Sequence, residues 1–176
     1  MKVSVCCSVL NQKEMFRQMV GSVHLQTFKD WELIIVDDGS TDDIKSVCDE
    51  FKDERIKYFR LPENRGIPHG INYAFSLASG DYVQALAADE LLVVTKLAEQ
   101  VEYLDSNPSI EAIWGLPGNG GIGLRPEFEQ YQLKAQNRSN EAWVKTLLEL
   151  DSVPIGSAGC LFRKELLESL GYFDET

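Results

Sequence analysis

Short apolar runs alternate with amphipathic segments over the first half of the chain. The runs at residues 3–9, 31–36, 56–59 and 82–86 are mostly apolar, which is typical of strands that are buried on both faces. Between these runs, apolar residues recur at helical spacing. The helices are marked by Met15, Phe16, Met19, Val20 and Val23, by Ile44, Val47 and Phe51, and by Ile67, Ile71, Ala74, Phe75 and Ala78. The alternation predicts an α/β fold with a mostly parallel central sheet and helices on both faces.

The second half of the chain continues the pattern less regularly. Apolar residues at helical spacing predict a helix from about residue 94 to Asn107, and a strand is expected at 110–114. A glycine-rich loop over 115–126 follows, and then a helix around 143–150, a strand at 158–162 and a helix over 164–170 that ends at Gly171. The length of 176 residues and the hydrophobic content of 44% fit a single domain.

The charge balance narrows the classes of partner. The chain has 17 basic and 28 acidic side chains, for a net charge of -11 at pH 7, so nucleic acid is not an expected partner. Clustered carboxylates instead favour a divalent cation. The four cysteines have no Cys-x-x-Cys spacing and are expected to be reduced core residues. No secretory signal or run of 18 apolar residues is present, so a cytoplasmic location without a transmembrane segment is expected, with peripheral contact at the inner membrane face left open.

Asp37 and Asp38 follow the second predicted strand directly. A carboxylate at the carboxyl end of a parallel strand can accept hydrogen bonds from a nucleobase or a ribose. Two alternatives stay open for the pair: an Asx turn in which one aspartate caps the next helix, and an acidic pocket of the receiver type. Ser40 or Thr41 is the expected cap of that helix.

Asp89 and Glu90 follow the strand at 82–86. An unpaired carboxylate beside apolar residues is costly, and a bound Mg²⁺ or Mn²⁺ would offset that cost. One aspartate can suffice for such a site, because these ions take other ligands from phosphates and water. The alternative is that Asp89 or Glu90 caps a helix that begins near Leu91.

Four blocks in order resemble the inverting glycosyltransferases of family 2, which have the GT-A fold, a Rossmann-like arrangement. They are VSVCCSVLN, SVHLQTFKDWELIIVDDGSTDD, ENRGIPHGINYAFSLASGDYVQALAADE and GSAGCLFRKELLESLGYFDE, and together they cover nearly the whole chain. The resemblance implies one GT-A domain over 1–176, with the nucleotide-binding half at 1–90 and the start of the acceptor-side half at 91–176. It also implies that this domain is incomplete at the C-terminus.

The resemblance implies roles for individual residues. Asp38, with Asp37 beside it, would contact the base or ribose, Ser8 would lie near the base, and Arg65 would lie beside the nucleotide. Asp89 matches the last aspartate of the metal-binding DxD motif and would hold Mn²⁺ or Mg²⁺. The chain departs from the family at two positions: Ala87 stands where the first carboxylate of DxD is expected, and Leu10 replaces a tyrosine that many members stack on the base.

The activity implied is transfer of a sugar from a nucleotide sugar, with a UDP-sugar the expected donor, by a single inverting displacement. The acceptor would be a carbohydrate or a lipid-linked sugar, in the synthesis of a cell-surface polysaccharide. The general base is expected beyond Thr176, so no residue is assigned to it and these 176 residues are expected to be inactive alone. Because Ala87 removes one carboxylate, a nucleotide-sugar-binding or regulatory module without transferase activity is the alternative.

Other motifs carry less weight. Residues 118–123 match G-x-G-x-x-G, but this loop does not follow a strand directly or open a helix, as a dinucleotide-binding fingerprint should. A sugar nucleotidyltransferase would need a glycine-rich, basic loop after the first strand, which 10–13 do not provide. Of the two histidines, only His69 lies near the expected nucleotide site.

Overall fold

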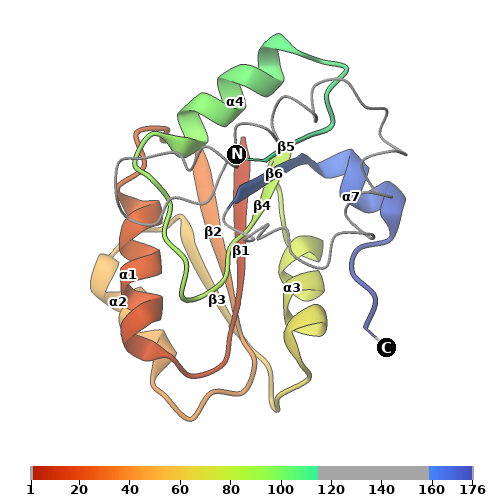
Figure 1. Cartoon of the computed structure of the whole chain (residues 1–176). Helices are drawn as coiled ribbons and strands as arrows, with labels where there is room; N and C mark the ends of the chain where they lie inside the picture. The colour runs from red at the N-terminus through yellow and green to blue at the C-terminus, as the bar shows by residue number, and fades with distance from the viewer. Residues whose placement is uncertain (1, 115–158, 176) are drawn as a thin grey trace, which may run out of the picture.

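The computed structural model describes residues 2–114 and 159–175 (Figure 1). A six-stranded sheet with the order β3-β2-β1-β4-β6-β5 forms its centre. The strands are β1 (Val3–Val9), β2 (Trp31–Asp37), β3 (Ile56–Arg60), β4 (Tyr82–Ala85), β5 (Ala112–Trp114) and β6 (Cys160–Arg163). Strands β1 to β4 are parallel, whereas β6 runs antiparallel to both β4 and β5. The prediction of a mostly parallel sheet in an α/β fold is confirmed.

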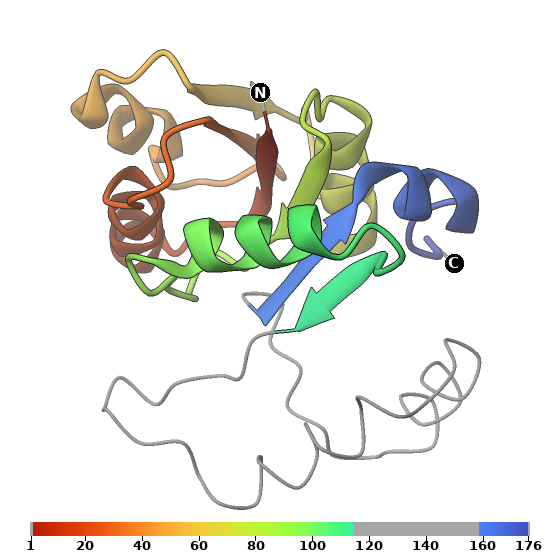
Figure 2. The same ribbon diagram turned by 90° about the horizontal axis from the view of Figure 1, so that it is seen from above.

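Helices cover both faces of this sheet, as the sequence predicts (Figure 2). Helices α1 (Lys13–His24), α2 (Ile44–Phe51) and α4 (Lys96–Ser106) pack on one face, and α3 (Ile67–Ser76) and α7 (Lys164–Leu170) lie on the other. The strand period of two residues explains the two cores, because successive side chains point to opposite faces. In β1, Val5 and Cys7 join the α1 side, while Cys6 joins the α3 side. All four cysteines are buried and reduced, as expected.

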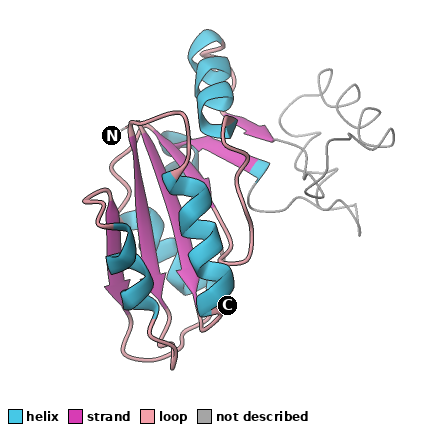
Figure 3. Cartoon of the chain, turned by 90° about the vertical axis from the view of Figure 1, so that its left-hand side faces the viewer, coloured by secondary structure: helices cyan, strands magenta, loops and turns pink. Residues whose placement is uncertain are grey.

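The strand order places β1 between β2 and β4, so the loops that follow these strands lie at one end of the sheet (Figures 1 and 3). The turns after β1, β2 and β3 form the lower end of the molecule in Figure 1. The chain after β4 turns toward α1 before it reaches α4. Residues that are far apart in sequence therefore meet at this end of the sheet.

Several local predictions need correction. The cap of α2 is Asp43, whose carboxylate accepts a hydrogen bond from the backbone N–H of Ser46, and neither Ser40 nor Thr41 caps this helix. Ser40 and Thr41 instead belong to the β2–α2 loop, where both form hydrogen bonds with the β1–α1 loop. The β2–α2 loop is therefore longer than expected. The predicted loop at 115–126 and helix around 143–150 lie outside the described residues. None of the helices within the described ranges is long and apolar enough to cross a membrane.

A buried carboxylate ties the amino ends of the strands together. Glu32 in β2 is fully buried, and its Oε1 accepts hydrogen bonds from the Ser4 hydroxyl at 2.6 Å and from the N–H and hydroxyl of Ser79 at 2.8 and 2.7 Å. Its Oε2 pairs with Lys57 Nζ at 2.6 Å. Burial raises the pKa of Glu32, but the hydrogen bonds from Lys57, Ser4 and Ser79 outweigh it and bring the pKa to about 2. Glu32 is therefore a structural carboxylate, distant from the loop end of the sheet.

Glycine 70 allows α3 to approach the end of β1. A Cβ added at Gly70 would lie 2.2 Å from Ser8 Oγ and 3.0 Å from Ser8 Cβ. Gly21 in α1 is different, because its nearest neighbour would be Phe51 at 3.9 Å. The contact between Gly70 and Ser8 thus determines how closely α3 packs against β1, next to the expected nucleotide site.

We expect Glu32→Gln to lower the free energy of unfolding at pH 7 by on the order of 2 kcal/mol, because Lys57 loses its buried anionic partner. The folded-state pKa of about 2 lies below the ordinary value of 4.5, so the contribution of Glu32 is complete above about pH 4.5 and is lost as the pH falls toward 2. Urea unfolding at several pH values measures both effects. Glu102→Gln, on an exposed residue of α4, is the control. A pH dependence that is identical in wild type and Glu32→Gln would contradict this role.

Gly70→Ala should destabilise the domain by about 1–3 kcal/mol, because the new methyl group overlaps Ser8. The matched control is Gly21→Ala, which adds the same methyl group to a helix where there is space and should be neutral or stabilising by up to about 1 kcal/mol. Chemical denaturation of the two variants makes the comparison. If both changes stabilise equally, the close approach at Gly70 is not a constraint.

Candidate functional site

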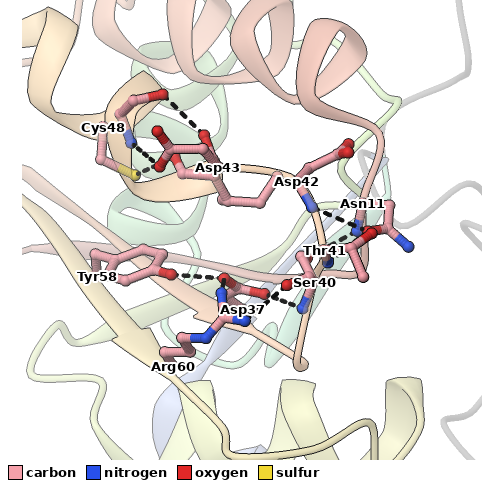
Figure 4. Close-up of polar contacts among 11 residues, drawn as sticks. Asn11, Asp37, Ser40, Thr41, Asp42, Asp43, Cys48, Tyr58 and Arg60 are labelled. Carbon is pink, nitrogen blue, oxygen red and sulfur yellow. Dashed lines mark hydrogen bonds and ion pairs between the residues drawn. The ribbon is translucent and has the colours of Figure 1, made fainter.

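The loops that follow β1 and β2 are joined by a set of hydrogen bonds (Figure 4). Asn11 Oδ1 accepts from the Thr41 backbone N–H and hydroxyl, both at 2.9 Å, and from the Asp42 N–H at 3.3 Å. The Asn11 N–H in turn donates to the Ser40 hydroxyl at 2.8 Å. The Lys13 N–H donates to Asp42 Oδ2 at 3.1 Å, so the β2–α2 loop also supplies an acceptor to the first turn of α1. Together these contacts form the Asn11 latch.

The latch holds a strained backbone. Asn11 and Gln12 have φ values of 60° and 64°, in the left-handed region that residues other than glycine seldom adopt. Asparagine tolerates this region better than most residues, but two such residues in succession cost free energy that surrounding contacts must offset. The hydrogen bonds at Asn11 provide those contacts.

Asp37 supports the same loop from inside the protein. Its carboxylate is fully buried and accepts hydrogen bonds from the Ser40 N–H at 2.8 Å, Tyr58 Oη at 2.5 Å and Arg60 Nη1 at 2.7 Å. Arg60 also donates to the Ser40 carbonyl oxygen at 2.6 Å. Burial and the bond to Asp37 raise the pKa of Tyr58 to about 12. Asp37 thus supports this loop and does not cap α2, whose cap is Asp43, while its expected contact with a nucleotide stays a prediction.

Asp38 connects the end of β2 to the start of α3. It is 2% exposed, and its two oxygens accept from the N–H groups of Arg65 and Gly66 at 2.8 and 2.9 Å. Gly39, with a φ of 79°, is needed in the same place, because a Cβ there would lie 2.9 Å from the Asn64 backbone nitrogen. Asp38 therefore fixes the turn that carries Arg65, whose side chain is exposed.

Ser8 and Leu10 complete this side of the site. Ser8 is half-buried at the carboxyl end of β1, on the side of the sheet that faces α3. Leu10 is 38% exposed just beyond the strand. The structure thus brings Ser8, Asp37, Asp38 and Arg65 to one end of the sheet, as the sequence predicts.

Asp89 lies in the turn after β4, on the other side of β1. The preceding residues Leu86 and Ala88 are buried, but Asp89 is exposed and accepts no hydrogen bond from any described residue. The alternative that it caps a helix near Leu91 is wrong, because α4 begins at Lys96. Among the described residues, no three acidic, histidine or cysteine side chains gather into a metal site. A cation at Asp89 would need most of its ligands from elsewhere.

Gln26 is a residue that the sequence analysis missed. Its fully buried amide donates to the carbonyl oxygens of Ser22 at 3.1 Å and Val93 at 2.8 Å, and its Oε1 accepts from the Leu97 N–H at 3.1 Å. Thr95, at the cap position of α4, makes no side-chain cap bond. A glutamine about 70 residues earlier therefore caps α4 and holds the chain that follows Asp89.

The C-terminal segment packs on α3. His69 Nδ1 and Asn72 Nδ2 each lie 2.9 Å from one oxygen of Glu175. Asn72 also exchanges two hydrogen bonds with the backbone of Phe173. These contacts engage His69 within the protein and lower the pKa of Glu175 through the bonds from Asn72 and His69.

Comparisons with known proteins agree with this geometry. The model of glycosyl transferase family 2 matches residues 4–171. The UDP-Glc:alpha-D-GlcNAc-diphosphoundecaprenol beta-1,3-glucosyltransferase WfaP of Escherichia coli is 33% identical over 104 residues, which are 59% of this chain and 41% of that enzyme. The chain spans less than half the length of the curated relatives that it matches.

Solved structures show the same fold. The crystal structure of S. aureus TarS 1-349 in complex with UDP-GlcNAc has a TM-score of 0.77 and 21% identity, and the match covers 99% of this chain and 49% of that chain. The mannosyltransferase PcManGT of Pyrobaculum calidifontis, in complex with GDP-Man and Mn²⁺, has a TM-score of 0.74 and 24% identity over 99% of this chain and 48% of that one. These are GT-A glycosyltransferases, so the sheet described above is a GT-A sheet. Since the family match covers nearly all of its length, the chain belongs to glycosyl transferase family 2.

Proposed function

We propose that this chain binds a nucleotide-sugar donor, with a UDP-sugar the first candidate, and takes part in transferring its sugar with inversion at the anomeric carbon. The observation that carries the proposal is the set of polar residues at the carboxyl ends of β1, β2 and β4, where ligands of parallel α/β sheets bind. The complexes of TarS with UDP-GlcNAc and of PcManGT with GDP-Man support a nucleotide-sugar donor. WfaP, named for a diphosphoundecaprenol-linked acceptor, supports a lipid-linked sugar as acceptor.

Residues 1–90 would carry the donor side of this site. Ser8 and Leu10 would border the nucleoside, and Arg65 would lie beside it and offer its positive charge to the phosphates. Asp38 would act in two ways: it holds the Arg65 turn through two backbone hydrogen bonds, and a lone pair of its carboxylate would accept from the base or ribose. Asp37 would act through the loop that it supports. Residues from 91 onward would contribute to the acceptor side.

Asp89 would hold the divalent cation, Mn²⁺ or Mg²⁺. The residues present fit a cation that is shared with the donor rather than a cage made by protein alone: one exposed carboxylate accepts no hydrogen bond from a described residue, and Ala87 offers no second carboxylate. Mg²⁺ is commonly held by one or two carboxylates together with phosphates. When bound, the cation would neutralise charge that develops on the leaving nucleoside diphosphate.

The reaction would be a single displacement. An acceptor hydroxyl attacks the anomeric carbon, a carboxylate removes its proton, and the nucleoside diphosphate leaves with the bonding electrons. None of the described residues is assigned the role of that base. Asp89 and Arg65, from the turns after β4 and β3, would fix the position of the diphosphate, and the sugar would lie on the side of the diphosphate away from the nucleoside.

A binding or regulatory module of the same fold is the second candidate, and Ala87 is the observation that favours it. Such a module would bind the nucleotide sugar without consuming it. Mixing the protein with a UDP-sugar and a lipid-linked sugar as acceptor, and following release of UDP, separates the two candidates.

We expect the chain to bind UDP with synergy between nucleotide and Mn²⁺, because two phosphates and one carboxylate repel each other unless a cation lies between them. Asp89→Asn should raise the Kd for UDP in the presence of Mn²⁺ by roughly 10- to 100-fold, and should change the Kd measured without metal very little. Isothermal titration with UDP, with and without Mn²⁺, measures these values.

Glu102→Gln is again the control, because it removes the same charge from the outer surface of α4. Synergy that persists undiminished in Asp89→Asn would remove Asp89 from the metal site. Absence of UDP binding by the wild type, with or without Mn²⁺, would contradict the assignment of a UDP-sugar donor.

A further inference from the structure

The orientation of the Asn11 amide is fixed by its neighbours. Its Oδ1 faces three donors in the β2–α2 loop, namely two backbone N–H groups and the Thr41 hydroxyl (Figure 4). A flipped amide would place its NH₂ group against these N–H donors, which is repulsive. The assignment of oxygen and nitrogen in this side chain therefore follows from the hydrogen-bond network.

The Asn11 Nδ2 has no such role. It points away from the β2–α2 loop in Figure 4, and none of the described residues accepts a hydrogen bond from it. Asn11 is only half-buried. Its Nδ2 therefore does not count as a buried donor left without a partner in the described part of the chain. Two N–H donors are thus held rigidly at the carboxyl end of β1 and remain open to a ligand.

The position of this amide indicates which part of a donor it would meet. The strand order is β2-β1-β4, so a diphosphate held near Asp89 after β4 leaves the nucleoside over β1 and β2. Asn11 lies on this nucleoside side, in the loop after β1 and bonded to the loop after β2. A group that only donates requires an acceptor. The acceptors on a nucleobase edge that differ between bases are keto oxygens, which uracil and guanine have where cytosine and adenine have amino groups.

We propose that Asn11 is a specificity-determining residue of the nucleotide site: Oδ1 locks the two loops together, and Nδ2 donates to a keto oxygen of the nucleobase. This inference rests on the proposed binding of a nucleotide-sugar donor. It explains why an asparagine is useful at a position with positive φ, since one side chain supplies the acceptor for the loop and the donor for the ligand. It also fits the UDP and GDP conjugates bound by TarS and PcManGT, because both bases carry a keto oxygen.

Asn11→Asp separates the two roles of the side chain. The aspartate keeps an oxygen for Thr41 and Asp42, so the loops stay joined, but it replaces the NH₂ group with an oxygen that can only accept. The titrations use UDP, CDP, GDP and ADP with Mn²⁺. Wild type should bind UDP more tightly than CDP and GDP more tightly than ADP. In Asn11→Asp, we expect the affinity for UDP to fall by about 3- to 10-fold and the preference for UDP over CDP to disappear or invert.

Thr41→Val is the matched control, because it removes a hydroxyl donor to Oδ1 but leaves Nδ2 in place. It should keep the preference for UDP over CDP. Thermal unfolding of each variant shows whether the fold survives. If Asn11→Asp fails to fold, the same titrations on Asn11→Ser, which has no NH₂ group, decide the question, and the UDP preference should be lost there as well.

The outcomes distinguish this inference from the function on which it rests. A folded Asn11→Asp or Asn11→Ser variant that keeps the wild-type ratio of UDP to CDP affinity overturns the role of Nδ2 and leaves nucleotide binding intact. A wild-type chain that binds none of the four nucleotides overturns the proposed function and this inference together. A loss of the UDP preference in Thr41→Val as large as in Asn11→Asp would show that loop geometry, and not the NH₂ group, selects the base.

Discussion

The burial of β1 between β2 and β4 is the constraint on which the rest of the structure depends. Its backbone N–H and C=O groups are satisfied by parallel neighbours on both sides, and helices cover both of its faces. No water reaches the middle of such a strand, so it can carry only apolar or fully paired side chains. Polar residues that would act on a ligand are therefore confined to the carboxyl ends of the strands and the residues that follow them, where Ser8, Asp38 and Asp89 stand.

Most of the acidic residues discussed above form hydrogen bonds within the protein. Glu32 joins strand β2 to residues near β1 and β4 at the amino end of the sheet, while Asp37 and Asp38 fasten loops at the carboxyl end. Each accepts several hydrogen bonds, which is the usual condition for a buried carboxylate. Asp89 differs, because it is exposed and lacks such bonds from the described residues. The contrast supports a ligand-directed role for Asp89 more strongly than the acidic composition does.

The sequence predicted the order and type of the described helices and strands, because each has a clear apolar period and the parallel arrangement follows from their alternation. The residues at the site were also placed at the correct end of the sheet, by their position after strands and by family resemblance. Sequence could not predict which protein donors each aspartate binds. Asp37 and Asp38 are adjacent, but Asp37 accepts from Tyr58 and Arg60 of β3, whereas Asp38 accepts from backbone N–H groups of the turn before α3. The contacts that Asn11 and Gln26 make with distant loops could not be predicted from the neighbouring sequence, because an amide in a polar loop has many possible partners.

The Gln26 contacts have a consequence for how the protein reaches its native state. The chain that follows Asp89 is hydrogen-bonded to the end of α1 and the residues just after it. The carbonyl oxygens of Val93 and Val94 accept from Gln26 and Thr27, and the Leu92 N–H donates to the Ser22 hydroxyl. These partners are separated by about 70 residues, so joining them closes a long loop at an entropic cost that local helix formation cannot offset. Assembly of the turn that carries Asp89 would thus include a non-local step that requires α1 to be in place. The Asp89 turn would be among the last regions to become ordered during folding.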